Sequence, residues 1–200
     1  MLNPRGGGYE LIVVGASWGG LAALRTLVNN LPASLPMAVT LVQHRHRDSD
    51  HHMSMVLQSE CALAVCEVED KMPLEPGRIY IAPPDYHTLI ERGYFSLSTE
   101  APVRYSRPSI DVTFLTAADS YGPRMVGVVL TGANADGSEG LRRIIDRGGL
   151  AMIQNPATAE SSTMPDAAMR AVPEALVMEL AEMGQFIASL SASAAERGSA

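Results

Sequence analysis

The sequence predicts a doubly wound α/β fold, with a mostly parallel sheet and an appended antiparallel hairpin. Three observations predict it: short apolar runs typical of buried strands, helically spaced segments between them, and two alternating runs around Arg92-Gly93. The 200 residues, 46% of them hydrophobic, suffice for one domain with a substantial core. We expect residues 1–8 to be a disordered leader, residues 9–190 to form that domain and residues 191–200 to be a polar tail.

Composition excludes several classes of partner. The formal net charge is −7 and the pI is about 5.2, and no broad basic patch is evident, so we expect no nucleic-acid partner. No apolar run approaches the length of a membrane span, so the protein is not expected to insert into a membrane. Residues 1–8 lack the apolar region of a secretory signal, which leaves the cytoplasm as the expected location.

The turn between the first predicted strand and helix is the most informative for function. Leu11–Val14 is an apolar run typical of a buried strand, and Leu21–Val28 has helical spacing. Between them lies Gly15-x-Ser17-x-Gly19, in the strand–turn–helix context of a nucleophile elbow. A dinucleotide-binding loop would need glycine where Ser17 stands. A plain tight turn without chemistry remains the other alternative.

The next elements alternate between strand and helix patterns. The apolar run at residues 37–43 predicts a strand that leads directly into His44, and a helix is expected from near Ser49. Two further strands are predicted at residues 62–68 and 78–82. Residues 88–91 and 94–98 flank Arg92-Gly93 and predict the hairpin, from which we expect a mixed sheet.

The second half continues the alternation. Strands are predicted at residues 125–130 and 150–154, and helices at 110–118, at 138–147 and within 159–171. The last apolar segment, residues 175–190, includes a further helix. In doubly wound sheets, ligands bind outside the carboxyl ends of the strands.

Three of these turns place a polar residue at the carboxyl ends of the predicted strands. Ser17 follows the first strand, His44 the second, and Asp136 follows the strand at residues 125–130. A serine, a histidine and an aspartate at three strand ends can form a catalytic triad. Their order along the chain is Ser, His, Asp, whereas α/β-hydrolases have Ser, Asp or Glu, His, so an ordinary α/β-hydrolase is not expected.

At these residues the chain resembles the catalytic domain of the CheB-type chemotaxis protein-glutamate methylesterases, from about Glu10 to Leu190. Seven segments carry the resemblance, in the family's order. They are Val14-Gly-Ala-Ser-Trp-Gly-Gly20, Leu41-Val-Gln-His44, Ile79-Tyr-Ile-Ala-Pro-Pro-Asp-Tyr-His87, Arg107-Pro-Ser-Ile-Asp-Val112, Leu130-Thr-Gly-Ala-Asn-Ala-Asp-Gly137, Asn155-Pro-Ala-Thr-Ala-Glu160 and Met164-Pro165.

The resemblance implies a reaction and a set of roles. Members of the family hydrolyse the methyl esters of receptor glutamates, and some also deamidate receptor glutamines. By match of motif, Ser17 is the nucleophile, His44 the general base and Asp136 the residue that orients the imidazole. The oxyanion or pocket candidates lie around Trp18, Gly19 and Ala133. No metal and no cofactor is implied.

The resemblance also implies partners. The substrate would be the cytoplasmic domain of a methylated chemoreceptor. Two-domain members carry an N-terminal receiver domain, which this sequence lacks before its first strand, so we expect a stand-alone esterase domain that is controlled, if at all, by a separate receiver protein.

The sequence departs from the family at the expected site. Trp18 replaces the usual Thr or small residue, Ala133-Asn134 replaces Met-Gly, and Thr163 replaces Gly. None of these removes a triad member, but they leave the choice of substrate open.

Other residues offer rival roles. His87 is a second candidate base. His46, His51 and His52 raise the question of a metal site, but neither H-E-x-x-H nor a Cys/His ligand pair is present, and a solvated helix start explains them as well. Arg104 and Arg107 are candidates for docking an acidic receptor surface. Two other functions stay open: a non-catalytic or regulatory binding module of the same fold, and an esterase for small methyl esters.

Overall fold

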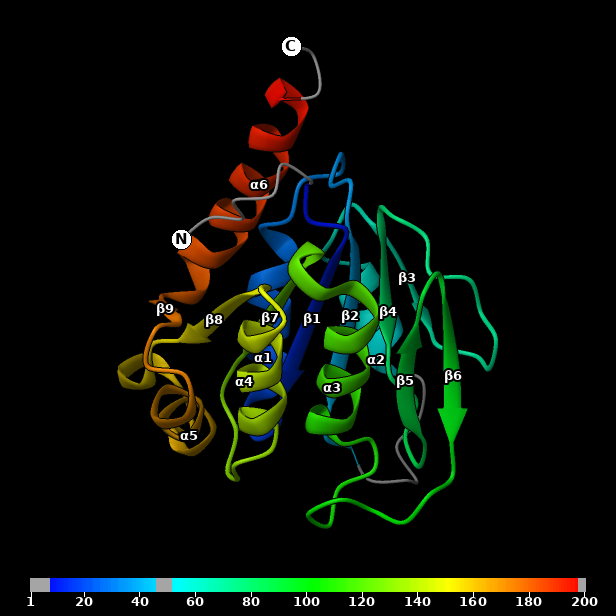
Figure 1. The fold of residues 1–200 in the computed structure, drawn as a ribbon, viewed down its shortest axis with the longest axis vertical. Helices are drawn as coiled ribbons and strands as arrows, with labels where there is room; N and C mark the ends of the chain where they lie inside the picture. The colour runs from blue at the N-terminus through cyan, green and yellow to red at the C-terminus, as the bar shows by residue number, and fades with distance from the viewer. Residues whose placement is uncertain (1–7, 46–51, 198–200) are drawn as a thin grey trace.

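A computed structural model describes residues 8–45 and 52–197 of the chain. The expected leader, apart from Gly8, and the expected helix start near Ser49 lie outside these residues. The described chain is an α/β domain built on one central sheet (Figure 1).

The central sheet has seven strands in the order β3-β4-β2-β1-β7-β8-β9, and each neighbouring pair is parallel. Its strands are β1 Leu11–Ala16, β2 Ala38–Gln43, β3 Ala64–Glu67, β4 Arg78–Ile81, β7 Met125–Val129, β8 Leu150–Gln154 and β9 Leu176–Met178. All residues of β1, β2, β7 and β8 are buried, because helices cover both faces there. The predicted doubly wound fold is confirmed.

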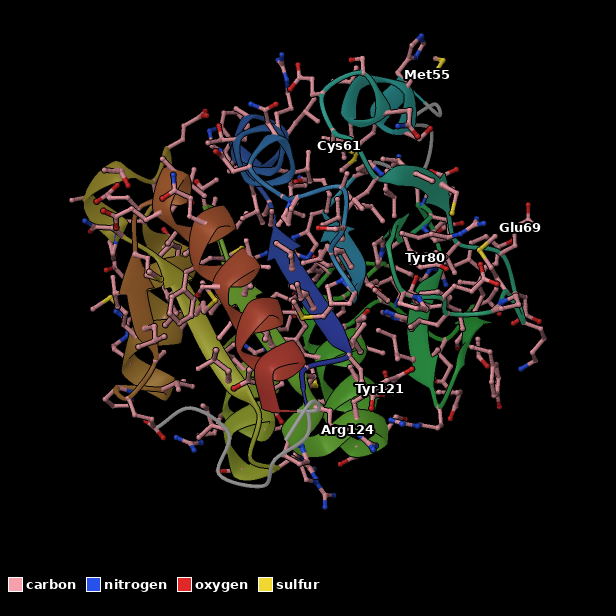
Figure 2. All side chains as sticks on the ribbon, turned by 90° about the horizontal axis from the view of Figure 1, so that it is seen from above. Met55, Cys61, Glu69, Tyr80, Tyr121 and Arg124 are labelled. Atoms are coloured by element: carbon pink, nitrogen blue, oxygen red, sulfur yellow. The ribbon has the colours of Figure 1, made fainter. Side chains whose placement is uncertain are left out.

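The expectation of a mixed sheet is wrong. The predicted hairpin exists as β5 (His87–Glu91) and β6 (Tyr94–Ser98), but it forms a separate two-stranded sheet. Its strands pair with each other, and β6 also bonds to the loop before β4: the Lys71 N–H donates to the Phe95 carbonyl and the Phe95 N–H to the Met72 carbonyl, both at 2.9 Å. Phe95 packs on Tyr80 of β4 with ring centroids 4.9 Å apart. Figure 2 labels Tyr80 where β4 faces the hairpin. These backbone hydrogen bonds and the packing of Phe95 attach the hairpin to the domain, and the central sheet stays parallel.

Helices cover the two faces of the sheet and bury two separate cores. On one face lie α1 (Gly20–Asn29), α2 (His52–Gln58) and α6 (Leu180–Arg197), whose side chains share a core with β1 and β2. On the other lie α3 (Ile110–Tyr121), α4 (Ser138–Asp146) and α5 (Thr163–Ala171), which share a core with β7, β8 and the hairpin. Figure 2 shows α1 and α2 on one side of β1 and α3 on the other. Two short 3-10 helices, Gly122–Arg124 and Pro156–Thr158, complete the described elements.

The end of the chain differs from the expectation. Strand β9 was not predicted within residues 175–190, and α6 continues past Leu190 to Arg197. Strand β9 has only three residues at the edge of the sheet, where Leu176 and Val177 are exposed, so it shows no buried alternation that a sequence pattern could reveal. No helix in the described ranges is both long and apolar enough to span a bilayer.

Candidate active site

Strand register places Ser17 beside His44. Ala16, the last residue of β1, pairs with Gln43, the last residue of β2. The ladder continues one step further, because the His44 N–H donates to the Ala16 carbonyl at 3.1 Å. The residue that follows each strand, Ser17 after β1 and His44 after β2, is a candidate catalytic residue. Adjacent parallel strands thus present Ser17 and His44 at the same edge of the sheet.

The three residues expected to form a triad lie in one hydrogen-bonded chain. His44 Nδ1 is 3.1 Å from Ser17 Oγ, and His44 Nε2 is 2.8 Å from Asp136 Oδ2. The Asp136 carboxylate is buried and accepts from several donors, so Nε2 carries the ring proton and donates to it. The Nδ1 lone pair therefore faces the Ser17 hydroxyl, as a general base requires.

The turn after β1 depends on glycine. Gly19 has a φ of +74°, in the left-handed region, and a Cβ there would come within 2.6 Å of Glu160 Oε2. The Gly20 N–H donates to the Ser17 carbonyl at 2.9 Å, which closes the turn at the start of α1. Thr131 Oγ donates to the Trp18 carbonyl at 2.9 Å. The elbow is thus held from β1, from α1 and from the loop after β7.

Gln43 ties the two strand ends together. Its side-chain Nε2 donates to the Ser17 carbonyl at 2.8 Å and to the His44 carbonyl at 3.0 Å. The amide side chain is buried. Gln43 was not predicted as a site residue; its position as the polar last residue of an otherwise apolar strand is the signal in the sequence that indicates such a role.

The start of α3 holds the Asp136 carboxylate. Its Oδ2 accepts from the Ile110 N–H at 2.7 Å, and its Oδ1 accepts from the Asp111 N–H at 2.9 Å and from Ser109 Oγ at 3.0 Å. Burial alone would raise the pKa of Asp136, but the hydrogen bonds from His44 and from these N–H groups outweigh it, and the pKa lies below its usual range. A helix N-terminus also favours a negative charge. Asp136 is therefore ionised.

Asp111 is a second buried carboxyl group beside Asp136. Burial, the largest cause, and the negative charge of Asp136 raise the pKa of Asp111, while the Gly140 N–H and Arg104 lower it, and the resulting pKa is about 6. Asp111 Oδ1 accepts from the Gly140 N–H at 2.8 Å, and Arg104 Nε lies 3.8 Å from Oδ2. Of the two neighbouring carboxyl groups, Asp111 is the one that takes up a proton first.

Backbone N–H groups near Ser17 remain available. The Ser17 N–H donates to the Thr131 carbonyl at 3.0 Å and cannot serve a substrate. Within residues 8–45 and 52–197, the N–H groups of Trp18, Gly19 and Ala133 have no acceptor. All three residues also line the pocket that contains Ser17. Unpaired backbone N–H groups of this kind can stabilise a developing oxyanion.

Two surface pockets meet at His44. One has a volume of about 400 Å³ and contains Ser17; the other is about 370 Å³. Trp18, with 64% of its surface exposed, lines the first, and Tyr105, which is fully exposed, lines the second. The Ser17 hydroxyl is therefore accessible from a groove that offers an aromatic side chain on each side.

The rival base has a structural role. His87 is buried, its Nδ1 accepts from the Ser109 N–H at 3.2 Å, and its Nε2 donates to the Ala101 carbonyl at 3.1 Å. Both ring nitrogens are thus occupied by backbone groups, and no contact joins His87 to Ser17 among the described side chains.

The other candidates are dispersed. His46 and His51 lie outside the described residues, and within those residues no three His, Cys, Asp or Glu side chains gather as metal ligands. Arg107 binds Asp85 and the carbonyls of Thr99 and Glu100. Its guanidinium holds the loop before α3.

The side chain of Asn134, a residue named above only as a departure from the family, contacts both His44 and Asp136, a role that was not predicted from the sequence. Its Oδ1 accepts from the Asp136 N–H at 3.0 Å, and its Nδ2 lies 3.3 Å from His44 Nδ1. The signal in the sequence is the Asn-x-Asp pattern, in which an Asn side chain often binds the N–H two residues further on.

Fold and site together define a class of protein. The nucleophile elbow, the serine–histidine–aspartate chain and the free backbone donors form the arrangement of a serine-type hydrolase on a parallel α/β sheet. The family model for CheB methylesterase matches residues 12–187. The chain belongs to the CheB methylesterase family.

Relatives and a solved structure agree with this. A protein from Leptospira interrogans, provisionally named protein-glutamate methylesterase/protein-glutamine glutaminase, is 41% identical over 91% of this chain and 95% of its own length. A Nocardioides protein-glutamate methylesterase/protein-glutamine glutaminase is 38% identical over 91% of this chain, which spans about half of that relative. The crystal structure of the Thermotoga maritima CheB methylesterase catalytic domain superposes with a TM-score of 0.88 at 28% identity, covering 91% of this chain and 98% of that one.

Proposed function

We propose that this protein hydrolyses the methyl esters of glutamate side chains in the cytoplasmic domains of methylated chemoreceptors, and that it can also deamidate receptor glutamines. One observation carries the proposal. The 3.1 Å and 2.8 Å contacts of His44 join Ser17 to a buried, ionised Asp136 at the mouth of a surface pocket. The family supplies the substrate class.

The geometry supports a two-step acyl transfer. Ser17 Oγ attacks the ester carbonyl while His44 Nδ1 takes its proton, and Asp136 stabilises the imidazolium through Nε2. The Nδ1 proton then passes to the methoxide as the ester C–O bond breaks, so methanol departs and the glutamyl group stays bonded to Ser17 Oγ as an acyl-enzyme. A water molecule, activated by the same nitrogen, attacks the acyl group and releases glutamate. In deamidation the leaving group is ammonia.

The negative charge of the tetrahedral intermediate needs donors. The N–H of the residue after the nucleophile is the usual first donor at an elbow, and here that is Trp18. Ala133, from the loop after β7, offers a second N–H, and Gly19 lines the same pocket. We propose the N–H groups of Trp18 and Ala133 as the oxyanion hole.

A direct test is methanol release from receptor membranes methylated with a radioactive methyl group. Wild-type protein is expected to release methanol, whereas Ser17→Ala should be folded by circular dichroism and slower by roughly 10³-fold or more. A serine-directed phosphonate should label the wild-type protein but not the variant.

Two outcomes would favour the other functions. If neither turnover nor labelling of Ser17 occurs, the protein is a binding module of the same fold. If a panel of small methyl esters is hydrolysed but methylated receptor is not, the substrate is a small molecule. Adding a separate phosphorylated receiver protein in the same assay tests the proposed control partner.

A further inference from the structure

Asn134 places an amide donor next to the nucleophile. Its Oδ1 is fixed by the Asp136 N–H at 3.0 Å, which leaves Nδ2 facing the imidazole, 3.3 Å from His44 Nδ1. Ser17 Oγ lies 3.1 Å from the same nitrogen. A neutral imidazole nitrogen has a single lone pair in the plane of the ring, so two donors that reach it lie side by side. The Asn134 N–H therefore neighbours the oxygen that attacks the substrate.

Proton transfer frees this donor. In the resting enzyme Nδ1 can accept from Asn134, but once it has taken the Ser17 proton it is itself a donor and can accept nothing. The Asn134 N–H then lacks an acceptor in a partly buried site, where an unsatisfied donor costs on the order of 1–3 kcal/mol. At the same moment the substrate carbonyl oxygen, bonded to the same carbon as Ser17 Oγ, becomes negatively charged.

We infer that Asn134 is a further catalytic residue, whose side-chain amide moves its hydrogen bond from His44 Nδ1 to the oxyanion. This inference rests on the proposed ester hydrolysis and adds a side-chain donor to the two backbone donors. Such a donor binds the transition state better than the ground state, because its competing acceptor disappears only as the oxyanion forms. It stands where the family's usual residue, glycine, has no side chain to donate.

The first test is steady-state hydrolysis of p-nitrophenyl acetate at a pH where His44 is unprotonated. Asn134→Ala is expected to lower kcat by roughly 10- to 100-fold, with KM nearly unchanged, because one oxyanion donor is lost. The inhibition constant of phenylboronic acid, which forms a tetrahedral adduct with a serine hydroxyl, is expected to rise by a similar factor. A kcat for Asn134→Ala within twofold of wild type would overturn the inference.

A second variant separates the donor from the local turn. Asn134→Asp keeps an oxygen for the Asp136 N–H but replaces the amide donor by a negative charge. If Asn134 only shapes the loop, Asn134→Asp should be more active than Asn134→Ala. If Asn134 binds the oxyanion, Asn134→Asp should be the less active of the two. The comparison of kcat between the two variants remains a test of the inference even if Asn134→Ala is less stable than wild type.

Asn155 provides a matched control. Its Oδ1 accepts from the Ala157 N–H two residues on, at 3.0 Å, as Asn134 does for Asp136, but its Nδ2 binds Glu179. Asn155→Ala is expected to leave kcat unchanged, and an equal loss in both alanine variants would show that loosened loops explain the effect. Wild-type protein that cleaves no ester contradicts the proposed function itself, whereas active wild type with unaffected Asn134 variants contradicts only this inference.

Discussion

Two neighbouring carboxyl groups have pKa values shifted in opposite directions because their hydrogen-bond partners differ. Asp136 accepts from His44, Ser109 and the first N–H groups of α3, and its pKa is held low. Asp111 accepts from the Gly140 N–H, while its Oδ2 is buried without a hydrogen bond among the described residues. The negative charge beside His44 is therefore kept on Asp136.

His44 and His87 can be separated by their pH profiles. If neutral His44 is the base, kcat/KM for ester hydrolysis should fall as the pH decreases, because protonated Nδ1 cannot accept the Ser17 proton. His44→Gln should abolish hydrolysis. His87→Gln should lower the thermal midpoint, since two buried backbone contacts change, but the folded protein should keep the acid limb of the profile. The opposite result would mean that the two histidines had been assigned the wrong roles.

The raised pKa of Asp111 makes stability depend on pH. Its pKa is about 6 in the folded protein, against a usual value near 3.8, so the folded state binds the proton more tightly. The stability that neutral Asp111 contributes is complete below about pH 4 and is lost as the pH rises to about 6. Asp111→Asn, which still offers an oxygen to the Gly140 N–H, should be more stable than wild type at pH 7.5 by on the order of 1–3 kcal/mol. Urea unfolding at pH 4 and at pH 7.5 checks this, and an equal gain at both values would contradict it.

At the scale of elements, the loop before α3 carries an unusual turn. Val103 and Ser106 exchange two backbone hydrogen bonds, of 3.1 and 2.9 Å, around Arg104 and Tyr105, whose φ values are +49° and +64°. Asn-Gly usually fills such a two-residue turn, because larger residues are strained at positive φ. Strain of this kind is often kept at functional sites, and Tyr105 lines the second pocket beside His44.

Tyr105→Gly is therefore expected to keep or raise the free energy of unfolding, by up to about 1 kcal/mol. The KM of this variant for methylated receptor should rise. Its kcat and KM for p-nitrophenyl acetate should stay the same, because a small ester does not reach the second pocket, which Tyr105 lines. Tyr94→Gly, in the extended strand β6, is the matched control and should lose stability. A Tyr105→Gly variant that is less stable than wild type would show that the turn is not strained.

At the scale of the whole molecule, periodicity predicted most of the fold. Apolar runs identified β1, β2, β7 and β8, because strands buried on both faces consist of short, nearly continuous runs of apolar residues. The position of the hairpin could not be read in the same way, because alternation predicts pairing between β5 and β6 but not whether a third strand joins them. The three-residue β9 was missed for want of a pattern.

The candidate site was predictable only where residues stand at strand ends. Ser17, His44 and Asp136 follow predicted strands, so the parallel topology brings them to one edge. The roles of Gln43 and Asn134 depend on side-chain directions in loops, which no periodicity encodes. The burial of Asp111 likewise follows from the packing of α3 on α4, a contact between elements distant in the sequence.

The pairing of β1 with its two neighbours has a consequence for how the protein loses activity. Ser17 and His44 keep their spacing only while β1 and β2 remain paired in register, and Asp136 keeps its place only while the start of α3 stays packed beside the loop after β7. Central strands of this kind open only with the global unfolding of a domain. Inactivation by urea should thus be cooperative, and the urea concentration at half-maximal ester cleavage should equal the midpoint measured by far-UV circular dichroism. Loss of cleavage at a lower urea concentration would show that the site unfolds locally before the domain does. Where the midpoints coincide, an assay of ester cleavage counts folded molecules.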